Sequence, residues 1–225
     1  MTWDNNLIEC DSYITAKYLI YHTKCDIIQT KQGEEGDLVY KQCKTEQASR
    51  RQRQLEQGLL EAMLQQRFEE ISVSDLCEKM QVPRKTFYRY FEGKEGALYA
   101  LIDHALQDYE LYVTPRMDQD SSVLAYIELI FHYWWVRKDL LDCLEKSGLE
   151  GVLVQRAILR ANEEISRPIR FLDQHMIGEQ MNRNMFIVCG IMSMVLQWHH
   201  EGYSESVEQM ALTALSLLTK PLVSL

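Results

Sequence analysis

The sequence is poor in residues that interrupt helices. Its 225 residues include only 4 prolines and 10 glycines, the two residue types that break helices most strongly. The longest apolar stretch, residues 185–198, is shorter than the roughly 20 residues that a helix needs to cross a bilayer. We therefore expect an all-α protein with no membrane span.

The sequence also lacks paired cysteine motifs and the features of a secretory signal peptide. The 6 cysteines lie far apart with no CxxC pair, which argues against both a disulfide scaffold and a zinc site. The opening residues, MTWDNNLIECD, carry no basic segment and no small-residue cleavage site. We expect a cytoplasmic protein with no metal and no cofactor.

Positive charge is scarce overall but concentrated in one place. The net charge is −9, yet Lys79 to Lys94 holds five cations and one acid, a local +4 that leaves −13 on the remaining residues. This stretch also carries the aromatic residues of VPRKTFYRYF (82–91). A basic patch on an acidic chain indicates a polyanion-binding surface. The alternative is a solvated basic helix whose rings are plain core.

The region from 45 to 113 predicts a helix-turn-helix. Apolar residues at helical spacing predict a first helix, and SVSD from Ser72 predicts a capping box in which Asp75 reaches back to the cap amide. After a tight turn, Pro83 suits the start of a third helix that runs to about Phe91. A fourth helix carries Leu98 to Tyr109. Two short helices joined by a turn form the DNA-reading motif.

The helix after Pro83 has two faces. Phe87 and Phe91, four residues apart, can pack on a core. The residues that remain for a DNA groove are Arg84, Lys85, Thr86, Tyr88 and Arg89.

The stretch from Arg51 to Leu98, including LLEAMLQQRFEEISVSDLCEKMQVPRKTFYRYFEGKEGAL, resembles the DNA-binding domain of the TetR (tetracycline-repressor-like) family of bacterial regulators. By the resemblance, Arg84 and Lys85 lie where base edges are usually reached. Phosphate-contacting or positioning roles are implied for Thr86, Tyr88, Tyr90 and Lys94, and an approach to the DNA backbone for Arg51 and Arg53. Pro83 and Lys85 depart from the family pattern, in place of a capping serine and a small residue. The candidate DNA-binding residues are Arg51, Arg53, Ser72, Arg84, Lys85, Thr86, Tyr88, Arg89, Tyr90 and Lys94.

The last hundred residues predict further helices and a homodimer. Expected helices span 122–136, 138–146, 149–165, 168–176, 181–201 and 204–219. The last two are more loosely similar to the helices that form an intermolecular four-helix bundle in TetR-like homodimers. Their apolar residues spread over more surface than one chain readily covers; a monomer core is the alternative. These residues are Phe186, Ile187, Gly190, Ile191, Met194, Val195, Trp198, Met210, Ala211, Ala214, Leu217 and Leu218.

The middle helices are rich in aromatic residues and methionine. By the resemblance, they would surround a pocket for an unknown small-molecule effector, and we select Tyr109, Trp134 and Met176 as candidates. The alternative is that these side chains are ordinary core.

The sequence favours no enzyme. His199 and His200 are adjacent, so on a helix they point about 100° apart and do not readily share a metal ion. We find no glycine-rich phosphate loop, nucleophile elbow or HExxH motif.

Three regions follow: an extension of unknown role (1–44), a helix-turn-helix domain (45–98), and an effector-binding and dimerisation domain (99–225). The sequence predicts a ligand-responsive repressor that binds a palindromic double-stranded DNA operator as a homodimer. The alternative is a helical dimeric interaction or ligand-binding protein that does not bind DNA specifically.

Overall fold

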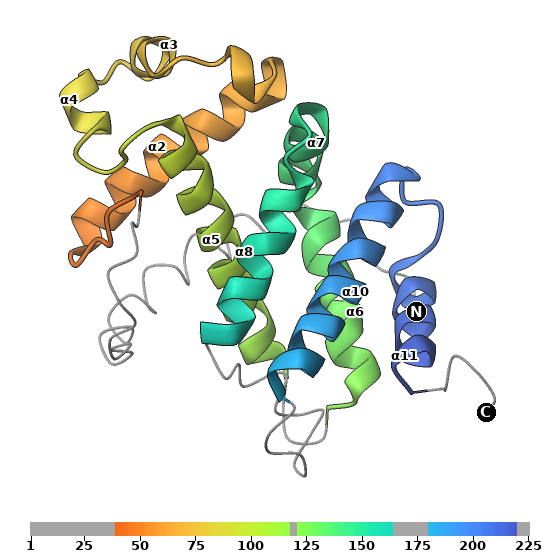
Figure 1. Cartoon of the computed structure of the whole chain (residues 1–225). Coiled ribbons are helices and arrows are strands. Elements are labelled where there is room, and N and C mark those ends of the chain that lie inside the picture. The colour runs from red at the N-terminus through yellow and green to blue at the C-terminus, as the bar shows by residue number, and fades with distance from the viewer. Residues whose placement is uncertain (1–38, 118–120, 164–179, 220–225) are drawn as a thin grey trace.

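The computed structural model describes residues 39–117, 121–163 and 180–219. Over these ranges the chain forms α-helices and two short 3-10 helices, and no strand (Figure 1). This confirms the predicted all-α fold. The helix expected at 168–176 and most of the 1–44 extension lie outside the described residues.

Four elements form the head of the molecule. A long helix, α2 (Glu46–Gln65), begins at Thr45, whose hydroxyl oxygen accepts a hydrogen bond from the Ala48 amide. The remaining elements of the head are η2 (Phe68–Glu70), α3 (Val73–Lys79) and α4 (Arg84–Phe87). Figure 1 shows α3 and α4 beside α2 at one end of the molecule.

The recognition helix α4 is shorter than the sequence predicts. It ends at Phe87 rather than near Phe91, and residues 88–90 form a turn. Phe91 instead pairs with Tyr40 in an isolated antiparallel β-bridge. The chain that leaves the helix thus pairs with a segment that lies before α2 in the sequence.

The turn between α3 and α4 contains a left-handed residue. Gln81 has a φ of 54°, a conformation that side chains with a Cβ disfavour. The turn is closed by the Val82 amide, which donates to the Cys77 carbonyl at 2.9 Å.

The body contains the other helices. Helix α5 starts in the head and runs into the body, crossing the domain boundary predicted at residues 98 and 99 (Figure 1). Helix α10 packs against α8, and α11 packs against α6. None of the described helices is long and apolar enough to span a membrane. The elements are α5 (Lys94–Val113), η3 (Thr114–Arg116), α6 (Val123–Val136), α7 (Lys138–Ser147), α8 (Glu150–Glu163), α10 (Gln180–His200) and α11 (Val207–Thr219).

One hydrophobic core connects the head and the body. Leu59 and Phe87 in the head, Ile102 on α5 and Phe131 on α6 are all fully buried in the same cluster. Burying each such side chain stabilises the fold by about 1.5–3 kcal/mol. The head is therefore packed on the body through α5 rather than tethered to it.

We predict that Gln81→Gly stabilises the protein. Glycine adopts positive φ without strain, which stabilises the folded state. Glycine also raises the conformational entropy of the unfolded chain, but this destabilising contribution is smaller. The free energy of unfolding should therefore rise by about 0.5–1 kcal/mol. Urea unfolding measures the change. Gln81→Ala keeps a Cβ and is the control; equal stabilisation by both variants would contradict the explanation.

Candidate nucleic-acid interface

The outer face of α4 carries the predicted cations. Arg84, Lys85 and Arg89 are exposed, and Tyr88 is 48% exposed. Thr86 is half-buried. The structure therefore presents these side chains to solvent together, as a groove-reading surface requires.

The inner face of α4 is anchored by phenylalanine. Phe87 and Phe91 are 0% and 1% exposed, and their ring centroids lie 5.1 Å apart. Phe87 also meets Tyr88 edge to face at 5.8 Å. The expected division into buried phenylalanines and exposed cations is observed, but it extends over α4 and the turn after it and not over one helix.

Arg84 is ordered by its neighbour on the same face. Its guanidinium carbon lies 5.9 Å from the centroid of the Tyr88 ring. A side-chain hydrogen bond with Tyr88 raises the pKa of Arg84 further above its usual value. A permanently charged, pre-positioned guanidinium suits bidentate contacts to guanine or phosphate.

Ser72 caps α3. Its hydroxyl oxygen accepts from the Asp75 amide at 3.1 Å, which is one half of the predicted capping box. The other half is not formed, because the Asp75 carboxylate accepts from the Ser72 hydroxyl at 2.6 Å and not from the cap amide. Ser72 is exposed, so its cap lies at the surface and holds the first helix of the motif.

Two of the predicted contact residues point inward. The Lys94 ammonium donates to the carbonyls of Phe68, Glu69 and Ile71 at 2.8, 3.0 and 3.0 Å. These bonds use all three of its donors, so Lys94 clamps η2 to α5. Tyr90 is only 6% exposed. Both side chains therefore bond or pack within the protein and do not belong to the exposed face.

Arg53 and Arg51 bond to other side chains of the protein. Arg53 makes a bidentate pair with Asp108 of α5 at 3.1 and 3.0 Å, and Arg137 also binds Asp108 at 3.1 Å. Arg51 donates to Gln54 at 3.0 Å within α2. Arg53 therefore connects the head to the body, whereas Arg51 remains at the surface of the head.

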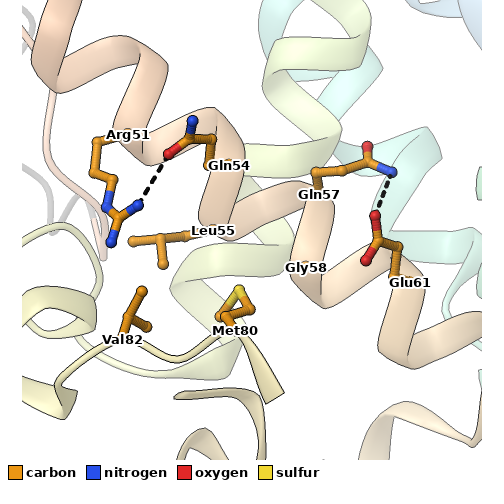
Figure 2. Close-up of a pocket in the computed structure, with 8 residues that line it drawn as sticks. All are labelled: Arg51, Gln54, Leu55, Gln57, Gly58, Glu61, Met80 and Val82. Carbon is orange, nitrogen blue, oxygen red and sulfur yellow. Dashed lines mark hydrogen bonds between the residues drawn. The ribbon is translucent and has the colours of Figure 1, made fainter. Parts of the chain in front are cut away.

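A groove of about 330 Å³ lies between α2 and the turn of the motif (Figure 2). Leu55, Met80 and Val82 supply apolar walls, and Arg51 lies at one end. Gly58 leaves room for the Met80 side chain, because a Cβ at this position would lie 2.0 Å from the Met80 sulfur. The groove belongs to the head and contains none of the predicted effector residues.

The effector candidates that the structure describes lie in packed surroundings. The Tyr109 hydroxyl donates to the Tyr126 hydroxyl at 2.8 Å, and the Tyr109 ring lies 5.4 Å from that of Tyr133. Trp134 is 2% exposed. Met176 lies outside the described residues. The effector pocket stays a prediction.

The apolar residues expected at a dimer interface divide into two groups. Ile191, Val195 and Trp198 of α10 are buried within the chain, as are Ala211 and Ala214 of α11. The expectation that one chain leaves these five uncovered is therefore wrong, because α6 and α8 cover the inner faces. Large apolar side chains still exposed on the two helices are Met185, Phe186, Leu212 and Leu217.

The adjacent histidines share one carboxylate, because His199 Nδ1 lies 3.3 Å from Glu145, which His200 also contacts. His199 Nε2 lies 2.7 Å from Asp142, and His200 Nδ1 lies 2.6 Å from Glu145. Within the part of the chain that the structure describes, no group of three or more histidine, cysteine or acidic residues could hold a metal ion.

Comparisons with known proteins bear on the fold alone. No family model and no curated protein sequence matches the chain. One solved structure to which it is similar is the dihydroxyacetone kinase operon activator DhaS, with a TM-score of 0.50 and 17% sequence identity. The match covers 75% of this chain and 93% of that chain. The two proteins share a fold, while membership of the TetR-like family stays a prediction.

Several polar residues that the sequence analysis did not select join the head to the body. Glu56 of α2 is 1% exposed, and its carboxylate oxygens lie 2.9 and 2.8 Å from His104 Nδ1 on α5. Tyr40 binds Asp103 of α5. Each pair is distant in sequence, and no local pattern marks either one.

We predict that Lys94→Ala destabilises the protein. Three carbonyls would lose their charged donor, so the free energy of unfolding should fall by about 2 kcal/mol. Chemical denaturation measures it. Lys79→Ala, at an exposed position, is the control and should cost less than about 0.5 kcal/mol. Equal effects of the two substitutions would show that Lys94 is not a clamp.

Proposed function

We propose that this protein is a DNA-binding transcriptional regulator. The observation that carries the proposal is the exposure of Arg84 and Lys85 on α4 and of Tyr88 and Arg89 in the turn that follows it, with Phe87 and Phe91 buried behind them. The shared fold with an operon activator supports the same function. No chemical step is required, since occupancy of DNA is itself the regulatory event.

Helix α4 would enter the major groove of duplex DNA. Arginine and lysine can bind the O6 and N7 acceptors of guanine, and tyrosine hydroxyls can bind phosphate. Ser72 at the start of α3 and Arg51 on α2 flank this helix in the motif and would lie near the DNA backbone. The acidic remainder of the chain would repel DNA, so binding would be confined to this face.

We further propose that the protein binds a palindromic operator as a homodimer. The exposed apolar residues of α10 and α11, foremost Phe186 at 67% exposure, would pack against a second copy. A two-fold dimer presents two α4 helices to successive major grooves, about 34 Å apart. A monomer has only one such helix and could read only a half-site.

We propose that the protein represses transcription and that binding of a small-molecule effector releases it from DNA. This proposal rests on the resemblance to TetR-like regulators, whereas the solved protein of similar fold is named an activator. A reporter gene under the selected operator decides between them: deletion of the protein should raise expression for a repressor and lower it for an activator.

A helical interaction protein that does not bind DNA specifically is the competing function. The exposed apolar residues of α10 and α11 favour this alternative, because exposed apolar patches are typical of surfaces that bind other proteins. It predicts association without sequence-selective, salt-dependent DNA binding.

We predict that Lys85→Ala reduces both DNA affinity and its salt dependence. The probe is a duplex that the wild-type protein selects from a random-sequence pool. Loss of one exposed cation from the DNA-facing surface should lower the slope of log K against log salt by about 0.9 at most. Fluorescence anisotropy across a salt series measures it.

Lys138→Ala is the matched control, because Lys138 is exposed on α7 in the body. It should leave affinity and slope unchanged. A salt-independent wild-type response, or equal losses in the two variants, would contradict the assignment of α4 to DNA.

We predict that Phe186→Glu and Leu212→Glu each convert a dimer into a monomer, because each buries a charge at the proposed apolar interface. Light scattering at micromolar concentration should give twice the 26.5 kDa chain mass for wild type and one chain mass for each variant. Leu64→Glu, at a 40% exposed position on α2, should remain dimeric. A wild-type protein of single-chain mass would reject the dimer.

A further inference from the structure

Three residues of the N-terminal extension are built into the head. Residues 39–41, which we name the strap, run antiparallel to the chain that leaves α4. The Lys41 amide donates to the Tyr90 carbonyl at 2.8 Å, and the Glu92 amide donates to the Val39 carbonyl at 3.0 Å. The strap thus supplies backbone partners to a segment that has left its helix.

The strap is also held from behind by α2. The Gln52 side-chain amide donates to the Lys41 carbonyl at 3.1 Å, and Gln52 is only 1% exposed. A buried amide without a partner is costly. The Gln52 contact therefore favours one position of the strap.

Helix α5 leaves room for the strap at a glycine. A Cβ on Gly96 would lie 2.2 Å from the Val39 carbonyl oxygen and 3.1 Å from its carbon. Both atoms are backbone, so the contact cannot be relieved by rotating a side chain. Glycine in the first turn of a helix costs helix stability, and here it permits the close approach of the strap.

Tyr40 joins the strap to the body. Its side chain is 8% exposed, and its hydroxyl donates to Asp103 of α5 at 2.5 Å. Burial, and then the Asp103 charge, raise the pKa of Tyr40 well above its usual value, so the hydroxyl keeps its proton. Arg156 of α8 binds the same carboxylate, with Nε 2.6 Å from Oδ1. The exit of α4 is thereby connected to α5 and α8.

We propose that the strap positions the recognition helix, fixing the exit of α4 to α5 and α8 so that the DNA-reading face takes its orientation from the body. The link to DNA rests on the proposed function, whereas the strap itself does not. Because α8 packs against α10, the strap also connects the DNA-reading face to the helices proposed to form the dimer.

The first test is Gly96→Ala in the full chain. Alanine normally strengthens a helix relative to glycine, but here it should displace the strap. Amide hydrogen exchange at Lys41 and Glu92 should accelerate at least about tenfold, and affinity for the selected duplex should fall by about tenfold. Gly151→Ala is the control, because a Cβ on Gly151 of α8 meets nothing within 4 Å; it should change neither quantity.

A gentler test is Tyr40→Phe, which keeps the ring and removes the bond to Asp103. Exchange at Lys41 and Glu92 should accelerate about threefold or more, with a parallel loss of affinity for the duplex. Tyr203→Phe is the matched control, since the Tyr203 hydroxyl is buried without a hydrogen-bond partner. This variant decides the question if Gly96→Ala does not fold.

The outcomes separate the strap from the proposed function. Unchanged exchange in a folded Gly96→Ala protein, or in Tyr40→Phe if the first variant is unfolded, would overturn the strap. Faster exchange with unchanged affinity for the duplex would overturn its positioning role. If the wild-type protein selects no duplex, the DNA-binding function fails and with it the positioning role, while the exchange data still decide whether the strap holds α4.

Discussion

A helix of four residues cannot hold its own shape in water, because so few backbone hydrogen bonds do not offset the cost of nucleation. Helix α4 has this length, so every side chain on its outer face is placed by what lies around it. The burial of Phe87 and Phe91 is the main contribution. The turn that contains Gln81 precedes α4, and the strap pairs with the chain that leaves it.

The polar contacts of the head have a common role. Lys94 holds η2, Arg53 binds Asp108, and Glu56 binds His104, and each contact links the α2 to η2 region to α5. Buried or half-buried charged pairs fix geometry more than they add stability. The head is consequently joined to α5 by packed side chains and polar contacts rather than by a linker.

The cations of the head divide into exposed residues and residues that bond within the protein. Arg84, Lys85 and Arg89 extend into solvent, whereas Lys94 and Arg53 neutralise carbonyl dipoles and a carboxylate inside the protein. All five look alike in a count of basic residues, but only exposed cations can release counterions from DNA. The salt dependence of binding should therefore reflect fewer cations than the local sequence contains.

The sequence by itself determined the helical class, the Ser72 cap, and the two faces of α4, because each depends on residues within one or two turns of each other. Only the tertiary structure decided that Tyr90 and Lys94 point inward, that Phe91 leaves the helix, and that residues 39–41 belong to the head. These features come from contacts between residues that lie far apart in the chain, such as Tyr40 with Asp103. Such partners meet only after the helices pack, so no local periodicity specifies them.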